Sequence, residues 1–525
     1  MDGLTADGMS AAHRWGDPSR AVTLPDGVRT LLASALGVRE PHPPASVAAL
    51  PPPGLSDRAL RALEAACSQV RTDDQARLAH AAGMSTVDLL RLRAGDAADA
   101  PDAVIAPADH DEVTDVLAAC AAHRIAVVTF GGGTSVVGGL RASRDGYAGV
   151  VAVDLARLGR LRHLDPVSRT ATFEAGVRAP RAEELLAEQG FTLGHFPQSF
   201  ERATIGGFAA TRSSGQASSG YGRFDQMVVG LRVATPSGTL HLGRAPHTAA
   251  GPDLRQLFLG SEGALGVITE VTVQIRPTPP ARRYLGWRLA DFAAATEAAR
   301  ALAQDGPLPA VLRCSDELET TVNAVSEGAS ADGCLMITGI EGTEDEVAGV
   351  ASALTERLAG LGGQPLGEEP GQAWLRGRFA APYLRDALLD AGALVETVET
   401  AAFWSALPAT YAAVRDALAT SLAGQGTPPL VLCHISHVYS SGASLYFTVV
   451  AAQADDPVAQ WQAAKAAAGD AIAASGATIT HHHGVGRDHI PWYRDEIGHE
   501  GVAVLRAVKR ALDPEGVLNP GVLLP

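Results

Sequence analysis

The hydrophobic pattern changes character at about residue 103. Before it, two amphipathic stretches at 28–37 and 57–70 predict helices on either side of a proline-rich interruption at 41–53. After it, apolar runs at 104–107 and 126–130 enclose an amphipathic stretch at 111–123, which predicts strand, helix and strand. The second apolar run leads directly into a loop with five glycines among its nine residues, 131–139.

The same pattern divides the rest of the chain. Further strands are predicted at 150–154, 170–174, 228–235 and 265–275, with a helix at 180–190 and a stretch rich in glycine, serine and threonine at 194–222. Beyond the prolines at 277–280, helices (292–303, 343–361, 406–423, 458–474) alternate with strands (334–339, 430–438, 444–451), which favours a layered cap over the first large domain. We therefore predict an amino-terminal extension at 1–100, a first large domain at 101–279, a cap at 280–490 and a carboxyl-terminal segment at 491–525 that returns to the first large domain.

Composition narrows the class of protein. The 525 residues are 46% hydrophobic and carry a net charge of -16, without a basic stripe, so we expect no nucleic-acid partner. The five cysteines have no C-x-x-C spacing, and neither a secretory signal nor an apolar run long enough to span a membrane stands out. We expect a protein of a reducing compartment, the cytoplasm.

The glycine loop does not fit a dinucleotide fingerprint of the Rossmann type. That fingerprint needs a helix directly after the glycines, whereas the next regular element predicted here is a strand at 150–154. Consecutive backbone amides in a tight loop can nevertheless bind phosphate without a helix. A structural turn explains the loop equally well on its own.

Three further segments change that balance: Pro197 to Gly207, Thr211 to Gly215, and Leu259 to Thr269. Together with the glycine loop, and in this order, they resemble the FAD-binding domain of the vanillyl-alcohol oxidase family. The resemblance implies an α+β fold, in which a two-subdomain FAD-binding domain carries an α/β cap domain. It implies that FAD is held by Thr129, Phe130, Gly131, Gly132, Gly133, Thr134, Ser135, Gln198, Ser199, Thr204, Thr211, Arg212, Ser213, Ser214, Glu262, Gly263, Ala264, Leu265, Gly266, Val267 and Ile268. Since Thr134 and Ser135 stand where some members attach flavin through histidine or cysteine, noncovalent binding is expected.

Hydroxy-acid enzymes of this fold carry a metal site, built from a histidine-rich strand and a later E-H-G-x-G. Here Tyr446 stands at the place of the second histidine, and His482 replaces the glutamate before His483 and Gly484. Losing a carboxylate and an imidazole together disfavours a metal ion, although His434, His437 and His483 remain as possible ligands. We therefore predict no metal.

The same departures resemble the alkyldihydroxyacetonephosphate synthase family, and the resemblance covers nearly the whole chain. It implies that the acyl group of acyl-dihydroxyacetone phosphate is exchanged for a fatty alcohol in ether lipid synthesis, without net redox change. It implies Tyr446, His481, His482 and His483 as catalytic residues. Arg385, with Arg313 and His195 in support, is implied as the substrate-binding set.

The residues alone leave other interpretations open. Tyr446 also fits a core position, Arg385 a surface pair with Asp386, Arg313 a brace of the cap and His195 a turn. The run of three histidines at 481–483 is also typical of a solvated surface feature or of a metal-binding tract. The alternative function is an FAD-linked oxidase or dehydrogenase of an alcohol or 2-hydroxy acid. For the transferase we expect a homodimer, and peripheral contact with the membrane that holds its lipid substrate.

Overall fold

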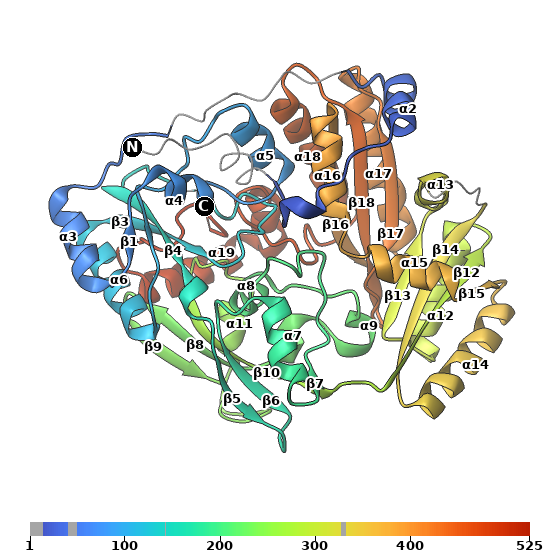
Figure 1. Ribbon diagram of the computed structural model, residues 1–525, viewed down its shortest axis with the longest axis horizontal. Coiled ribbons are helices and arrows are strands. Elements are labelled where there is room, and N and C mark those ends of the chain that lie inside the picture. Colours follow the sequence, from blue (N-terminus) through green and yellow to red (C-terminus); the bar gives the residue numbers. More distant parts are fainter. Residues whose placement is uncertain (1–13, 40–49, 142, 327–331, 525) are drawn as a thin grey trace.

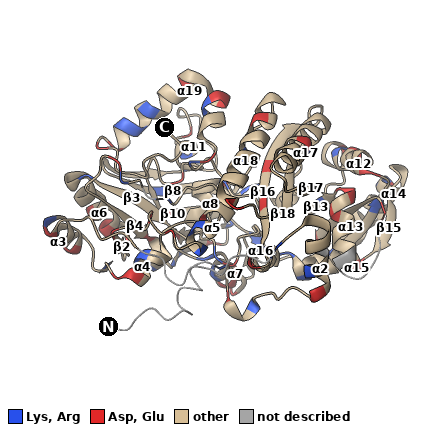
Figure 2. Ribbon diagram, turned by 90° about the horizontal axis from the view of Figure 1, so that it is seen from above, with Lys and Arg blue, Asp and Glu red and all other residues tan. Residues whose placement is uncertain are grey.

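The computed structural model describes residues 14–39, 50–141, 143–326 and 332–524, so 1–13 and 40–49 of the predicted extension lie outside the described residues. The elements fall into two halves, with the sheets of the first large domain in one and the sheet of the cap in the other (Figure 1). Basic and acidic segments are interspersed over the ribbon (Figure 2).

The first sheet has the order β1-β2-β4-β3. Its strands β2 (Ala103–Ile105), β3 (Ile125–Phe130) and β4 (Gly149–Asp154) are parallel, and β1 (Val70–Arg71) joins antiparallel. The helices α3 (Asp57–Ala66) and α6 (His110–His123) contact each other, and their apolar residues share one core with these strands. The βαβ unit of β2, α6 and β3 delivers the glycine loop at the carboxyl end of β3.

The second sheet is antiparallel, in the order β5-β6-β10-β8-β9. Its strands are β5 (Leu161–Asp165), β6 (Thr170–Glu174), β8 (Val228–Thr235), β9 (Gly238–Leu242) and β10 (Val267–Gln274). The helices α7 (Ala179–Ala187), α8 (Ile205–Thr211), α9 (Ser218–Tyr221), α10 (Phe224–Met227) and α11 (Arg255–Phe258) connect them, and β7 (Phe191–Thr192) pairs with β11 (Arg276–Pro277).

The cap contains a sheet in the order β15-β12-β14-β13-β17-β18-β16, and all its strand pairs are antiparallel. The strands are β12 (Ala281–Leu289), β13 (Val311–Ser315), β14 (Cys334–Gly342), β15 (Gln364–Gly367), β16 (Ala393–Phe403), β17 (Leu430–Ile435) and β18 (Gly442–Ala452). Between them run α12 (Phe292–Asp305), α13 (Glu317–Ser326), α14 (Glu344–Gly360), α15 (Glu369–Gly377), α16 (Ala381–Asp390) and α17 (Leu407–Gly424), and α18 (Pro457–Ala474) follows the last strand. The alternation of helix and strand seen in the sequence is therefore compatible with a fully antiparallel sheet.

Both ends of the described chain tie the halves together. The segment after α19 (Ile490–Leu512) returns to β3, where the amide of Asn519 donates to Val127 O and the amide of Val127 donates to Val517 O, each at 2.8 Å. At the other end, α2 (Asp26–Leu36) packs on α16 and β16 of the cap. Later in the amino-terminal extension, α4 (Asp74–Ala79) contacts β2 of the first sheet, and the next helix, α5 (Thr86–Arg93), contacts β16 and α18 of the cap.

Candidate active site

A cavity of about 410 Å³ is bounded by the first large domain and by the cap. It brings together the glycine loop and the three segments that follow it in sequence. The predicted cofactor positions that line it are Thr129, Gly131, Gly132, Gly133, Thr134, Ser135, Gln198, Ser199, Thr204, Thr211, Ser213, Ser214, Glu262, Gly263, Gly266 and Ile268. On the cap side, the predicted residues Arg313, Arg385, Tyr446, His482 and His483 line the same cavity.

The glycine loop passes so close to neighbouring backbone that side chains do not fit. A Cβ on Gly132 would overlap the carbonyl oxygen of Arg202, and a Cβ on Gly131 would lie 2.5 Å from Oγ1 of Thr204. Gly133 has a φ of +70°, which strains any other residue. The loop therefore needs its glycines to bring backbone amides to the cavity wall.

Several predicted residues do not reach the cavity. Phe130, Ala264, Leu265 and Val267 are buried in hydrophobic clusters, and Arg212 turns away to bond Leu259 O. His195 lies behind the wall, with Nε2 3.1 Å from Oγ of Ser213, and burial lowers its pKa to about 3. His481 is also absent from the lining, although its neighbours His482 and His483 are present.

On the cap wall, a row of polar side chains crosses three neighbouring strands. Tyr446 of β18 is paired with Glu399 of β16 on one side and with His434 of β17 on the other. The rings of Tyr446 and His434 stack at 4.9 Å. Glu319 of α13 lies 3.1 Å from Nδ1 of His434 and accepts a hydrogen bond of 2.8 Å from Arg313. Strand register, rather than sequence proximity, therefore assembles this wall.

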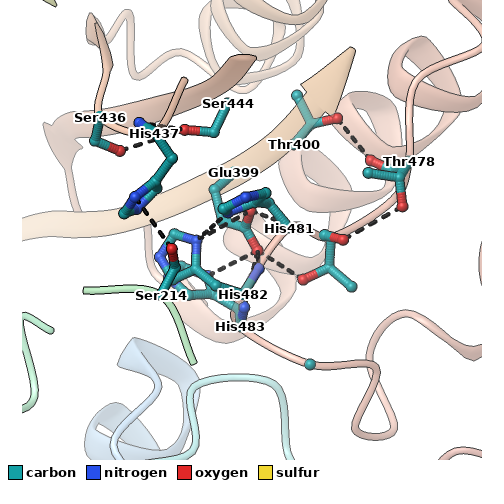
Figure 3. A network of polar contacts seen from close by, with 12 residues as sticks. Ser214, Glu399, Thr400, Ser436, His437, Ser444, Thr478, His481, His482 and His483 are labelled. Carbon is teal, nitrogen blue, oxygen red and sulfur yellow. Dashed lines mark hydrogen bonds and ion pairs between the residues drawn. The ribbon is translucent and has the colours of Figure 1, made fainter. Parts of the chain in front are cut away.

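The carboxylate of Glu399 anchors residues 480–483, the histidine loop. Its buried carboxylate accepts hydrogen bonds from the backbone amides of His481, His482 and His483, at 2.7, 3.1 and 3.0 Å, and from the hydroxyl of Thr480 at 2.6 Å (Figure 3). Glu399 is a functional residue that the sequence pattern does not predict. Its only signal was an acid inside the apolar run 393–403.

Burial sets the charge of the row. It raises the pKa of Tyr446 to about 12 and lowers the pKa of His483 to about 3. The pKa of His482 is lowered for the same reason, although Glu399 opposes the shift. At neutral pH the phenol is therefore protonated and these imidazoles are neutral, so Tyr446 has ring contacts with uncharged imidazoles rather than with cations.

Arg385 has unused donors. Its Nη1 donates to Met84 O at 2.6 Å, while Nε and Nη2 are buried without a hydrogen-bond partner. Asp386, the alternative partner considered for Arg385, is 3.9 Å away and accepts instead from the backbone amide of Trp15 at 2.6 Å. A planar guanidinium with spare N–H groups at a cavity wall suits an anionic oxygen ligand such as phosphate.

Comparison with known proteins identifies the two halves. Residues 101–243 match the family model described as FAD binding domain, and residues 278–523 match the C-terminal domain of FAD linked oxidases. The chain is 34% identical to alkyldihydroxyacetonephosphate synthase of Trypanosoma brucei brucei, over 91% of this chain and 82% of that protein. The chain belongs to the alkyldihydroxyacetonephosphate synthase family.

Two further similarities support the family assignment. The synthase of Dictyostelium discoideum is 33% identical over 87% of this chain and 79% of that protein. A solved structure of an alkyldihydroxyacetonephosphate synthase superposes with a TM-score of 0.83 at 28% identity, covering 97% of this chain and 98% of that chain. The predicted fold class, the enzyme class and FAD as cofactor are confirmed.

The residues of this family member fit the cofactor. Thr129 Oγ1 and Gln198 Nε2 face no protein partner although they are buried, and both residues line the cavity. Asn519 donates to Gly139 O and Glu262 O, at 3.0 and 2.7 Å, and so fixes two cradle segments to each other. FAD, when bound, would use the amides of 131–135 and these unpaired polar atoms.

Proposed function

We propose that this chain is an FAD-dependent alkyldihydroxyacetonephosphate synthase, which replaces the acyl group of acyl-dihydroxyacetone phosphate by a fatty alcohol. The observation that carries the proposal is Arg385, a residue that lines the same cavity as Tyr446 and the predicted FAD-binding segments and whose guanidinium has two buried donors without a partner. The apolar residues Trp15, Met84 and Val395 line this cavity too. A phosphate contact together with apolar walls supports an amphiphilic, phosphorylated substrate.

FAD supplies an electron sink for the carbon skeleton of the substrate. The guanidinium of Arg385 binds the phosphate and so orients the substrate in the cavity. Binding through the phosphate holds the headgroup in place while the acyl group leaves and the fatty alcohol enters.

Proton transfer falls to the cap wall. The ring centroid of His482 lies 6.0 Å from that of Tyr446, and the ring centroid of His483 lies 5.7 Å from it. The neutral imidazole of His482 takes the phenol proton, and the phenolate of Tyr446 then takes a proton from the substrate carbon. When Tyr446 returns that proton to the carbon, the imidazole gives its own proton back to the phenolate. Glu399, through the amides of the loop, keeps the imidazoles in place.

We also propose ether lipid synthesis in the cytoplasm as the setting, with a homodimer in peripheral contact with membranes. Both chains of the exchange partition into lipid, which supports contact with a bilayer. None of the helices in the described ranges is long and apolar enough to cross a membrane. Vesicle flotation tests the contact, and mass photometry tests the dimer.

One experiment tests the activity. The FAD-loaded protein is incubated without oxygen with palmitoyl-dihydroxyacetone phosphate and hexadecanol, and separately with D-lactate or D-2-hydroxyglutarate, while the flavin spectrum is recorded. We expect ether product and released palmitate without net flavin reduction. Full reduction by a hydroxy acid, with no ether product, would overturn the proposal in favour of a dehydrogenase.

A further inference from the structure

Three imidazoles converge at the inner end of the cap wall. His437 follows β17, and His481 and His482 come from the loop before α19. One ring nitrogen from each lies within 4.8 Å of the others. The rings of His437 and His481 stack at 4.9 Å, and the ring of His482 stands edge-on, at 5.2 Å from each (Figure 3).

Hydroxyl groups contact one ring nitrogen of His437 and one of His481, which leaves the other nitrogen of each ring to face the third imidazole. Nδ1 of His437 lies 2.6 Å from Oγ of Ser218 and 3.1 Å from Oγ of Ser214, which leaves Nε2 free. Nε2 of His481 lies 2.6 Å from the hydroxyl of Tyr439. When these outer nitrogens carry the protons, the inner nitrogens of both rings present lone pairs.

The facing nitrogens of His481 and His482 are already close to each other. Nδ1 of His481 lies 3.0 Å from Nδ1 of His482. Ligand nitrogens of a tetrahedral zinc ion, with bonds of about 2.0–2.1 Å, are roughly 3.3 Å apart. Small side-chain movements therefore bring all three nitrogens to metal-ligand spacing.

The surroundings suit a divalent ion. Oε2 of Glu399 lies 3.6 Å from Nδ1 of His482, so a carboxylate offsets part of an added positive charge. Outer hydroxyls that orient ligand imidazoles are the usual support of histidine metal sites.

We propose that His437, His481 and His482 form a binding site for a divalent transition-metal ion that prefers imidazole, with Zn²⁺ as the representative ion. Two of the three residues line the cavity, so the bound ion borders the substrate space. Three neutral imidazoles select Zn²⁺, Co²⁺ or Cu²⁺ over Mg²⁺ and Ca²⁺, which require oxygen ligands. The sequence pattern predicts no metal, because a carboxylate ligand is missing, and it does not reveal that the ring of His481 stacks on that of His437.

Occupancy of this site has a consequence that rests on the proposed function. A metal ion bound to His482 takes the lone pair that the proposed proton transfer needs. Zn²⁺ is therefore an inhibitor of the exchange reaction, and a chelator reverses the inhibition. The binding itself does not depend on the reaction.

Binding is tested on the FAD-loaded protein. The protein is treated with chelator, dialysed against buffered ZnCl₂, and its retained zinc is counted by mass spectrometry for the wild type, His437→Gln, and the control His499→Gln. His499 has a side chain that is 91% exposed and lies on α19, away from the cluster. We expect one zinc ion per chain in the wild type and the control, and at least about tenfold weaker binding in His437→Gln, because one of three ligands is lost.

Two results overturn the site: no stoichiometric zinc in the wild type, or equal affinity in His437→Gln. The flavin spectrum reports whether each variant is folded. If His437→Gln loses its flavin, Tyr439→Phe replaces it, and X-ray absorption at the zinc edge of the wild type must show imidazole scattering. A shell of oxygen atoms alone refutes the proposal.

Measuring ether formation with and without zinc distinguishes a failure of the metal site from a failure of the proposed function. Ether formation by the metal-free protein, inhibited by zinc and restored by chelator, supports both. Zinc binding without ether formation from the metal-free protein refutes the function and leaves the metal site intact. Ether formation that is unaffected at saturating zinc overturns the inhibitory role.

Discussion

Replacing Glu399 by glutamine tests how much the carboxylate of this residue stabilises the histidine loop. The carboxylate accepts four hydrogen bonds, three at Oε1 from Thr480, His482 and His483 and one at Oε2 from His481. An amide retains one acceptor oxygen and turns an NH₂ group toward the fourth donor. The amide of His481 then loses its partner inside the protein.

The cost follows from these contacts. A buried N–H without a partner costs about 1–3 kcal/mol, and each of the other three bonds weakens by about 1 kcal/mol when the acceptor loses its charge. A neutral amide is easier to bury, which offsets part of the loss. We expect a net destabilisation of the loop by about 2–4 kcal/mol.

Hydrogen exchange measures this effect where it occurs. The amides of 481–483 should exchange about 30- to 900-fold faster in Glu399→Gln than in the wild type, because about 1.4 kcal/mol corresponds to a factor of ten. The matched control is Glu396→Gln, another buried acid of β16, whose hydrogen bonds come from Thr86 and Thr397 instead. Unchanged exchange in Glu399→Gln, or an equal acceleration in the control, refutes the reasoning.

Four further predictions concern the cavity. Tyr446→Phe should keep FAD and reduce kcat for ether formation at least about 100-fold, because the group that exchanges a proton is gone. Arg385→Lys should raise KM for the phosphorylated substrate about 10- to 100-fold with little change in kcat, since a point charge replaces a fork of donors. Gly132→Ala should lose FAD on gel filtration, because the added Cβ overlaps the backbone of Arg202. Burial raises the pKa of Glu262 from 4.5 to about 7, so the wild type should lose up to about 3 kcal/mol of stability relative to Glu262→Gln as pH rises from about 4.5 to 7.

Each of these has its own control. Normal turnover in Tyr446→Phe removes the phenol from the reaction, and an unchanged KM in Arg385→Lys removes the phosphate contact. Gly146→Ala is the comparison for Gly132→Ala, because a Cβ there meets no atom within 4 Å, although the positive φ of Gly146 adds strain. For Glu262, the thermal midpoints of wild type and Glu262→Gln are compared with excess FAD at each pH. A constant difference between them contradicts the raised pKa.

The sequence predicted several strands with alternating or continuous apolar residues and missed others, among them β5, β9, β12, β13, β15 and β16. The predicted strands at 170–174 and 228–235 coincide with β6 and β8, since their residues follow the burial pattern of ordinary strands. β16 was not predicted, because Glu396 and Glu399 interrupt its apolar pattern while both are buried. Their partners come from Thr86 and the histidine loop, far away in sequence, so no local pattern signals that these acids face inward.

The candidate site shows the same limit. Motif order predicted most of the first large domain's side of the cavity, because glycines and small polar residues bring their own backbone to its wall. The opposition of Tyr446 and Glu399, and the stacking of His437 on His481, depend on strand register and loop direction. Both relations join residues more than 40 positions apart, which one sequence does not encode locally.

The pairing of 517–519 with β3 makes the cap an insertion within the FAD-binding half. Asn519 bonds the glycine loop at Gly139, 380 residues earlier in the chain. During synthesis on the ribosome, Asn519 emerges only after the whole cap. The wall that Asn519 and Gly139 form together is therefore completed after the cap has been synthesised. A fragment that ends at the prolines of 277–280 would lack the hydrogen bond from Asn519 to Gly139, even if its own sheets fold.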